Sequence, residues 1–271
     1  MGVVNVTPDS FSDGGRFLDP GAAIAQGRRL AAEGASILDV GGESTRPGAD
    51  PVPAEAELLR VIPVIEGLAG GAAQLSIDTS KVAVAQPALD AGASYVNDVT
   101  AFRSEPGLAA LVAERGVDCC LMHMLGTPRT MQDDPRYDDV VSDVKAFLAE
   151  RLAFAVAEGV PEERVMLDPG IGFGKTVEHN LELLRRLDEI VALGRPVVIG
   201  LSRKSFLGKI TGREAGDRAV ATAAANALAL ERGASVFRVH DVPETLDALK
   251  VTAATLAGRW PVTTPRTTTT T

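Results

Sequence analysis

The sequence predicts a single α/β domain, a (β/α)8 TIM barrel with its active site at the C-terminal face of the strands. Eight short apolar runs recur along the 271-residue chain, each followed by a Gly- or Pro-rich loop and then an Ala- and Leu-rich stretch. The runs are almost continuously hydrophobic, as in parallel strands covered on both faces. Aromatic residues make up only 4% of the chain, which favours an α/β enzyme over a β-sandwich.

Each predicted strand begins in apolar, mostly β-branched residues and ends where the chain turns polar or glycine-rich. The eight strands are predicted at Gly2–Val6, Ile37–Val40, Gln74–Ile77, Tyr95–Val96, Cys119–Met122, Val165–Leu167, Val197–Gly200 and Val236–Val239. Their number and their spacing over about 260 residues favour a closed barrel over an open, doubly wound sheet.

The first and last helices show their register most clearly. The first is predicted to begin at Pro20 after Asp19 as its N-cap, because proline is favoured at the first helical position. One face of this helix is predicted to pack on the core through Ala23, Ile24, Gly27, Leu30 and Ala31. The last helix is predicted to do so through Leu246, Leu249, Ala253 and Leu256.

No linker divides the chain before Pro261. Residues 1–260 are therefore predicted to form one domain, and residues 261–271 a disordered Thr-rich tail. The segment Met1–Phe11 lacks the basic region of a signal peptide, and no apolar run reaches the ~18 residues of a membrane span. Cys119 and Cys120 are adjacent and would point to opposite faces of a strand, so we expect reduced thiols in a cytoplasmic protein.

The net charge of the chain indicates which classes of ligand it can bind. The chain has 27 Lys and Arg against 36 Asp and Glu, a formal net charge of −9. This balance argues against a non-specific nucleic-acid binder, which needs a basic stripe. It leaves anionic small molecules open, because a basic pocket can form on an acidic protein.

Polar side chains recur where the predicted strands end, which is where barrel enzymes carry their chemistry. They are Asn5, Asp39, Asp78, Asn97, His123, Asp168, Ser202–Lys204, Arg238 and His240. Any one of them alone reads as a helix cap or turn residue, but capping does not explain the whole set on one rim. For His123 a place in the wall or core is favoured, and His179 is predicted to lie on the surface.

The residue types in this set indicate two kinds of subsite. Asp78, Asn97 and Asp168 suit the donor-rich edge of a heteroaromatic base. The loops after the seventh and eighth strands are cationic and occupy the usual phosphate site of this architecture. Ser205 is predicted to open a helix whose N-terminus favours a further anion. A solvated cluster of charges is the alternative for these loops.

Two long loops, Thr7–Asp19 and Gly41–Pro53, frame the rim and are interpreted as lids. Phe11 is a candidate apolar cover in the first, and Arg46 a candidate anion clamp in the second. Simple solvation of Arg46 is an equal alternative. The segment Asp168–Thr176 is not a P-loop, because Pro169 stands where that motif needs its first glycine.

Two of these segments, Asn5–Gly15 and Asp39–Gly48, resemble the signature segments of the dihydropteroate synthase family of pterin-binding enzymes. Further blocks resemble the same family and follow in its order from Gly2 to about Leu256: Ser76–Thr79, Asn97–Asp98, Asp168–Lys175, Ser202–Phe206 and Arg238–Asp241. One departure is that this chain opens directly on its first strand, before which many family members carry a short segment.

The resemblance implies condensation of (7,8-dihydropterin-6-yl)methyl diphosphate with 4-aminobenzoate, which gives 7,8-dihydropteroate and diphosphate in folate biosynthesis. It also implies Mg²⁺, a homodimer and inhibition by sulfonamides. Around the pterin it places Asp78, Asn97, Asp168 and Lys204. Around the diphosphate it places Asn5, Thr45, Arg238 and His240, with Asn5 also a Mg²⁺ ligand. Around 4-aminobenzoate it places Phe11, Thr45, Arg46, Pro47, Phe173, Lys204 and Ser205.

The residue chemistry fits a dissociative substitution. Mg²⁺, Arg238 and His240 can stabilise the departing diphosphate without a covalent nucleophile. The carboxylates of Asp78 and Asp168 favour the cation that remains on the pterin. Positioning and electrostatics then replace a nucleophile or general-base triad, so the catalytic set comprises Asp78, Asp168, Lys204, Arg238 and His240.

Two alternatives remain at this point. A pterin-binding methyltransferase domain would share the pterin-facing Asp and Asn but should lack the anion-binding groups of Ser202–Lys204, Arg238 and His240. A non-catalytic pterin-binding paralogue has no need for a diphosphate pocket. Release of diphosphate that depends on both substrates would distinguish these alternatives from the synthase.

Overall fold

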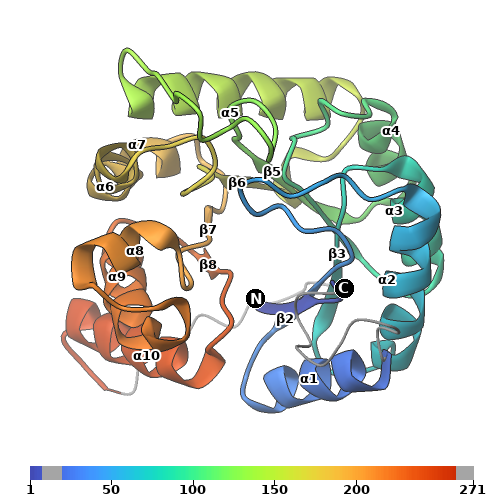
Figure 1. The fold of residues 1–271 in the computed structure, drawn as a ribbon, viewed down its shortest axis with the longest axis horizontal. Coiled ribbons are helices and arrows are strands. Elements are labelled where there is room, and N and C mark those ends of the chain that lie inside the picture. The colour runs from blue at the N-terminus through green and yellow to red at the C-terminus, as the bar shows by residue number, and fades with distance from the viewer. Residues whose placement is uncertain (8–19, 261–271) are drawn as a thin grey trace.

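A ring of parallel strands forms the inner wall of the protein, and helices surround it (Figure 1). The computed structural model describes residues 1–7 and 20–260, and within them it has eight strands. These are β1 (Gly2–Asn5), β2 (Ile37–Gly41), β3 (Gln74–Asp78), β4 (Tyr95–Asp98), β5 (Asp118–Met122), β6 (Val165–Asp168), β7 (Val198–Ile199) and β8 (Val236–Phe237). All eight predicted strands are confirmed.

The ring closes into a barrel. Strands β1 to β6 form one parallel sheet in chain order, and β7 pairs with β8 in a second. Single parallel bridges join the two sheets, one between Leu167 and Val197 and one between Gly2 and Val239. The Val3 amide donates to the Val239 carbonyl over 3.0 Å. The predicted last two strands are longer than observed because their outer residues pair only through such single bridges.

The helices cover the outside of the barrel. They are α1 (Pro20–Ala32), α2 (Ala54–Leu68), α3 (Val82–Asp90), α4 (Gly107–Arg115), α5 (Val140–Ala157), α6 (Val177–Arg185), α7 (Leu187–Val191), α8 (Ser205–Thr211), α9 (Ala219–Glu231) and α10 (Val242–Ala257). Short 3-10 turns lie at Glu162–Arg164 and Ala215–Asp217. Among the described residues, no helix has both the length and the apolar character needed to cross a membrane.

Helix α1 confirms its predicted face, because Ala23, Gly27 and Leu30 are buried. Helix α10 follows the prediction only in its first half. Leu246 and Leu249 pack against the core, whereas Leu256 is 57% exposed, so its predicted burial was wrong. The 16 residues of α10 extend ~24 Å at 1.5 Å per residue. The two-residue β8 is far shorter, so the end of the helix has no sheet beneath it.

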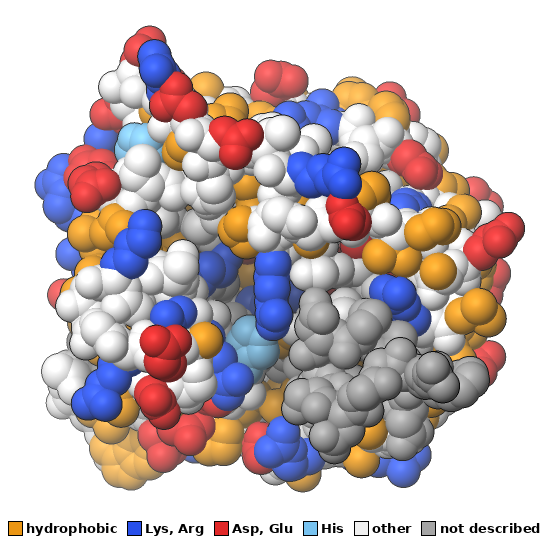
Figure 2. All heavy atoms as spheres, in the orientation of Figure 1, with side chains coloured by type: hydrophobic (Ala, Val, Ile, Leu, Met, Phe, Trp, Pro, Cys, Tyr) orange, Lys and Arg blue, Asp and Glu red, His pale blue; other side chains and the backbone are white. Residues whose placement is uncertain are grey.

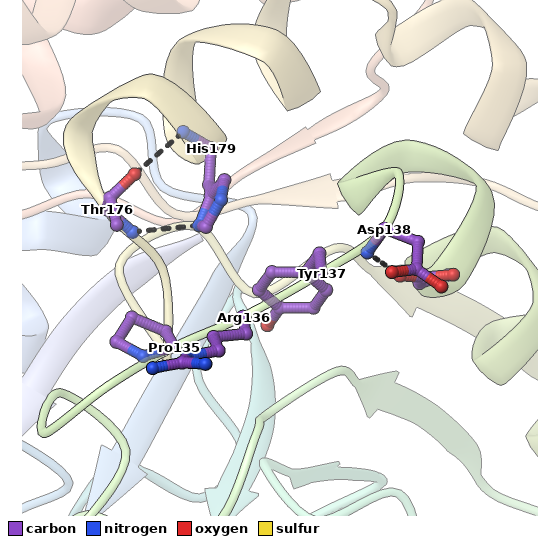
Figure 3. A pocket seen from close by; sticks show the side chains of 7 residues that line it. Pro135, Arg136, Tyr137, Asp138, Thr176 and His179 are labelled. Atoms are coloured by element: carbon purple, nitrogen blue, oxygen red, sulfur yellow. Dashed lines mark hydrogen bonds between the residues drawn. The ribbon is translucent and has the colours of Figure 1, made fainter.

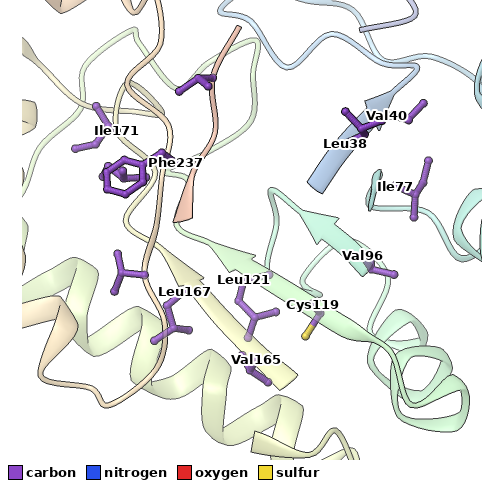
Figure 4. Close-up of a cluster of buried hydrophobic side chains, with 14 of the residues drawn as sticks. Leu38, Val40, Ile77, Val96, Cys119, Leu121, Val165, Leu167, Ile171 and Phe237 are labelled. Atoms are coloured by element: carbon purple, nitrogen blue, oxygen red, sulfur yellow. The ribbon is translucent and has the colours of Figure 1, made fainter. Parts of the chain in front are cut away.

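Side chains alternate between two apolar layers. Those facing outward, including Val96, Cys119, Leu121, Val165 and Leu167, belong to the main core beneath the helices (Figure 4). Those facing inward include Tyr95, Cys120 and Val198, which form a separate buried cluster. Cys119 and Cys120 thus lie on opposite faces as predicted, both buried and both free. The upper part of the barrel interior is polar, and the site begins there.

Candidate active site

The mouth of the barrel collects the polar side chains that the sequence predicted. Asn5, Asp78 and Asp168 are the last residues of β1, β3 and β6, and Asn97 is the last but one of β4. Lys204, Arg238 and His240 follow β7 and β8. Figure 2 shows Lys, Arg and His side chains around a hollow at the centre of one face. Strand register therefore brings together the residues predicted for the pterin and diphosphate sites.

A buried polar network forms the floor of the mouth. The Arg238 Nε donates to Asp39 Oδ2 over 2.6 Å, and its Nη2 donates to Asp78 Oδ2 over 2.8 Å. Asp39 also accepts from Ser76 Oγ at 2.5 Å and from Asn97 Nδ2 at 3.0 Å. The Asp39 side chain is fully buried. Two carboxylates therefore fix the orientation of the Arg238 guanidinium. Its Nη1 has no hydrogen-bond partner among the described residues.

Burial shifts the pKa values of the ionisable side chains at the floor of the mouth. It raises the pKa of Asp78, against the opposing effect of Arg238. Burial also raises the pKa of Asp168, although the Gly170 amide, which donates to its Oδ1 over 2.7 Å, works in the other direction. Burial would lower the pKa of Arg238, but Asp39 and Asp78 outweigh it and the pKa is raised. Buried carboxylates of this kind favour a ligand that offers N–H donors or positive charge.

Lys204 lies between two predicted subsites. Its ammonium donates to the Ile171 carbonyl and stands 4.2 Å from the centre of the Phe173 ring. Burial lowers the Lys204 pKa to about 8, with Asp168 opposing the shift. Lys204 and Asp168, predicted for the pterin, thus adjoin Phe173, predicted for 4-aminobenzoate. Ser205 begins α8 as predicted and is exposed.

The loop after β7 carries Arg203 and Lys204. Arg203 has a left-handed backbone with φ of +59°, an arrangement that costs about 1 kcal/mol or more. Its guanidinium pairs with Asp241, so Arg203 is held by the residues after β8. The loop after β7 still presents a cation at the mouth through Lys204. Local sequence patterns do not predict this ion pair, because Arg203 and Asp241 are 38 positions apart in the chain.

His240 is a neutral imidazole at pH 7. Burial lowers its pKa to about 4, and the cations Arg238 and Arg203 lower it further. Ser202 Oγ lies 3.0 Å from Nδ1 and accepts from the His240 amide over 3.1 Å, which fixes the ring. Arg46 also acts on this pKa, so the second lid brings its charge toward the same side of the mouth.

The second lid, defined here as residues 43–52, crosses part of the mouth. Two contacts attach it to the loop after β5. The Gly48 amide donates to the Pro128 carbonyl over 2.9 Å, and Asp50 pairs with Arg129. Thr45 is half-buried, whereas Arg46 and Pro47 are exposed. Phe11 and nearly all of the first predicted lid lie outside the described residues.

Several residues without a predicted role support the site. Asp39 was noticed at a strand end but given no function. Lys175 is buried and its Nζ lies 2.9 Å from His123 Nδ1 and 2.9 Å from the Phe173 carbonyl, so it supports the segment that carries Phe173. Burial lowers the His123 pKa to about 2, and the ring packs edge-on against Phe147, as expected of a core histidine. Asn180 fixes the same segment by accepting from the Gly172 amide over 2.7 Å.

An outer hollow of about 650 Å³ lies beside the mouth (Figure 3). Thr176 and His179 on its wall cap each other's backbone at the start of α6, and His179 is half-buried there, whereas the sequence predicted a surface position. Tyr137 donates to the Gly174 carbonyl over 2.7 Å and ties the loop after β5 to the loop after β6. Thr176, His179 and Tyr137 in the lining of the hollow therefore already have hydrogen-bond partners, and we interpret the hollow as part of the outer surface of these loops.

A resident metal site is not evident in the described part of the chain, where no cluster of three or more His, Cys, Asp or Glu could hold an ion. Asn5 alone offers a carboxamide at the end of β1, next to β8 across the closing bridge. Mg²⁺ commonly takes one or two protein oxygens, several waters and substrate phosphates. The described residues therefore fit Mg²⁺ as a companion of a bound diphosphate.

Comparison with known proteins gives a consistent result. The family described as pterin binding enzyme matches residues 1–240. The chain is 48% identical over 263 residues to the dihydropteroate synthase of Mycobacterium leprae, covering 94% of this chain and 93% of that protein. It is also 48% identical over 254 residues to a probable bifunctional folylpolyglutamate synthase/dihydropteroate synthase of Haloferax volcanii, of which it covers only 30%.

Solved structures agree over the same length. A Xanthomonas albilineans dihydropteroate synthase with 4-aminobenzoic acid is 52% identical and superposes with a TM-score of 0.89, covering 94% of this chain and 92% of that one. A Yersinia pestis dihydropteroate synthase with a sulfonamide drug complex is 42% identical with a TM-score of 0.90, covering 94% and 93%. The predicted (β/α)8 barrel is confirmed by these likenesses and by the closed ring of strands.

Proposed function

The chain belongs to the family of pterin binding enzymes, and we propose that it acts as a dihydropteroate synthase. This transferase joins (7,8-dihydropterin-6-yl)methyl diphosphate to 4-aminobenzoate, forming 7,8-dihydropteroate and diphosphate. The methyltransferase and non-catalytic alternatives lose support, because near full-length relatives at this identity are synthases.

One observation carries the proposal: Lys204 stands between the Asp168 side of the mouth and the Phe173 ring. The reaction needs the pterin methylene and the acceptor amine within bonding reach of one another. A site with separate, distant pockets would not serve it. Positioning two reactants in this way can lower a barrier by about 7–11 kcal/mol.

On the pterin side, Asp78, Asn97 and Asp168 would accept and donate hydrogen bonds along the edge of the ring. Burial raises the pKa of both carboxyl groups, while Arg238 beside Asp78 and the Gly170 amide beside Asp168 favour the ionised forms. As the bond between the methylene carbon and the diphosphate oxygen breaks, positive charge spreads into the ring. The two carboxylates favour that charge, and the amine nitrogen of 4-aminobenzoate then forms the new bond to carbon and releases a proton.

On the diphosphate side, Arg238 and His240 would stabilise the departing oxygens together with Thr45. Arg238 offers its free Nη1 while Asp39 and Asp78 hold the other side of the guanidinium. His240 is neutral before binding and so donates one hydrogen bond without adding a charge. Lys204, Ser205, Phe173, Thr45, Arg46, Pro47 and Phe11 would surround 4-aminobenzoate.

For Mg²⁺, Asn5 would supply the protein ligand, and the bound ion would neutralise charge on the leaving diphosphate. Replacing Asn5 by Ala should raise the Mg²⁺ concentration that gives half-maximal activity by about tenfold or more, because even the loss of an outer partner of a ligand costs about that much. Binding of a pterin that has no diphosphate should stay unchanged. Titration of Mg²⁺ against the rate for both proteins measures this, and an unaltered Mg²⁺ requirement contradicts the ligand role.

A homodimer and a cytoplasmic location complete the proposal. Exposed apolar side chains lie on the adjacent helices α9 and α10 and just beyond them: Val220, Leu228, Val251, Leu256 and Trp260. A second copy of the chain would cover this surface. Light scattering tests the dimer, with Val251→Asp expected to produce monomers. The two buried free thiols suit the reducing cytoplasm.

The activity itself is tested by following diphosphate release with each substrate omitted in turn. Release that requires both the pterin diphosphate and 4-aminobenzoate supports the synthase. Release with the pterin diphosphate alone, or none with both, contradicts it. Mass detection of dihydropteroate in equal amount to diphosphate excludes simple hydrolysis.

A further inference from the structure

A partly buried cluster of three charges lies beside the mouth, outside the residues assigned to substrates. Lys81 precedes α3, Glu57 lies in the first turn of α2, and Glu43 opens the second lid. The Lys81 ammonium donates to Glu57 Oε2 over 2.5 Å and also to Glu43 Oε2. We call these three residues the lid root. The Glu57 side chain is fully buried, and its Oε1 has no hydrogen-bond partner.

The lid root closes the base of the second lid. Glu43 Oε1 accepts from the Val52 amide over 3.0 Å, so one carboxylate joins the first and last parts of residues 43–52. Arg60 holds the preceding Gly42 by donating to its carbonyl over 2.7 Å. A Cβ on Gly42 would lie 2.8 Å from Val61 Cγ1, so this end of the loop packs closely against α2.

The tip of the second lid is held quite differently. Asp50 and Arg129, which pair there, are both largely exposed, with 76% and 65% of their side chains accessible. Exposed pairs of this kind contribute little to stability. Within the described residues, the other attachment of the tip is the hydrogen bond from the Gly48 amide to the Pro128 carbonyl. Thr45 and Arg46 lie between root and tip, and so their placement depends chiefly on the root.

The charge arrangement of the lid root is not one that stability alone would favour. Burying the Glu57 carboxylate fully is costly even beside an ammonium, and apolar residues of similar volume are often as stable. Such a cluster does impose a single geometry, because each charge is costly when it leaves its partner. Burial would lower the Lys81 pKa, but the two glutamates outweigh burial and keep the ammonium charged.

We propose that Lys81, acting with Glu57 and Glu43, is a positioning residue for 4-aminobenzoate binding. It fixes the root of the second lid, so that Thr45 and Arg46 stand ready at the mouth before the substrate arrives. This inference rests on the proposed function, which assigns those two lid residues to the acceptor. Lys81 itself touches neither substrate.

The test compares variants of the root with one of the tip. Lys81→Met alone leaves Glu57 uncompensated and endangers folding, so the main variant is Lys81→Met with Glu57→Gln, which removes the cation and the buried carboxylate together. Lys81→Arg keeps the charge, and Asp50→Asn alters only the tip. The measurements are KM for 4-aminobenzoate, affinity for a pterin without diphosphate, and hydrogen exchange of peptides covering residues 43–52 without ligand.

For the double variant we expect KM for 4-aminobenzoate to rise about tenfold or more, as a small misplacement of a positioning group does. Exchange of the Val52 amide should accelerate by a similar factor. The pterin affinity of the double variant should stay within about twofold of the parent's. Lys81→Arg keeps the cation, so its KM for 4-aminobenzoate should rise much less than that of the double variant. Asp50→Asn should change KM by less than about threefold.

Two results overturn the inference. One is a folded double variant whose residues 43–52 exchange as slowly as in the parent. The other is faster exchange with an unchanged KM for 4-aminobenzoate. Failure of the proposed function looks different, because the parent protein would then show no diphosphate release dependent on 4-aminobenzoate. The exchange measurement still reports on the lid root in that case.

Discussion

The strand-end side of the mouth and the lid side are built by different means. Asp39, Asp78, Asn97 and Asp168 stand on strands and are buried. The first three are linked across the barrel through Arg238 and through the bond from Asn97 to Asp39. The second lid carries exposed residues and is attached at its root and its tip. In the proposed function, the first arrangement would hold one flat ring, and the second would admit the acceptor. Changes to the first should affect the whole molecule, and changes to the second only the acceptor.

The largest effect is expected from Asp39→Asn. It leaves Arg238 without one of its two carboxylates and removes an acceptor from the floor network. Breaking a buried ion pair of this kind costs about 3–5 kcal/mol of unfolding free energy. Urea denaturation measures it, with Asp50→Asn in the exposed tip as the control, expected to cost about 0–1 kcal/mol. Equal losses for the two variants would contradict the contrast between floor and lid.

Lys204→Ala should have the next largest effect. The transition state should lose about 2.7–4 kcal/mol, the contribution of one preorganised charged donor, which lowers kcat/KM by about 10²–10³-fold. Lys204 belongs to both sides of the comparison, because it adjoins Asp168 and stands over Phe173. Lys209→Ala, on the exposed surface of α8, is the matched control. A Lys204→Ala enzyme with nearly full kcat would remove the central assignment.

The pH profile tests the same residue without altering the fold. Because burial lowers the Lys204 pKa to about 8, the ammonium is present below that pH and is lost above it. We expect kcat/KM to fall about tenfold per pH unit well above pH 8. His240, with its pKa lowered to about 4, stays neutral from pH 6 upward and adds no limb there. Rates measured from pH 6 to 10 that stay level above pH 8 contradict this role.

The smallest effects are expected at the lid. A sulfonamide resembles 4-aminobenzoate in ring, amine and anionic end, so it should inhibit competitively against that substrate. Its substituent projects beyond the substrate's volume and should press on Pro47 and on Phe11, which lies outside the described residues. Pro47→Ser and Phe11→Leu should therefore weaken the drug more than the substrate, by about 1–3 kcal/mol.

Competition kinetics on the parent and both variants measure this difference, with the Mg²⁺ and pterin concentrations held saturating. Noncompetitive inhibition against 4-aminobenzoate would place the acceptor elsewhere. Equal losses for drug and substrate would show that the lid does not distinguish them.

Much of the fold was readable because buried parallel strands leave a continuous apolar signal. The bounds of all eight strands were predicted to within two residues, and β7 and β8 are shorter than predicted because their outer residues pair only through single bridges. The face of α1 was also readable, since helical spacing reports which side meets the core. The same spacing misled at Leu256, because it says nothing of where a helix outlasts the sheet beneath it.

The amino-acid sequence by itself determined the barrel, the rim on which the chemistry sits and the residue types available there. Only the tertiary structure decided which charges are paired. Arg238 reaches Asp39 across 199 positions, Arg203 pairs with Asp241, and Lys81 joins two glutamates on different elements. Local patterns report periodicity and burial within one element. Ion pairs depend on distances between elements, which exist only once the strands have closed into a ring.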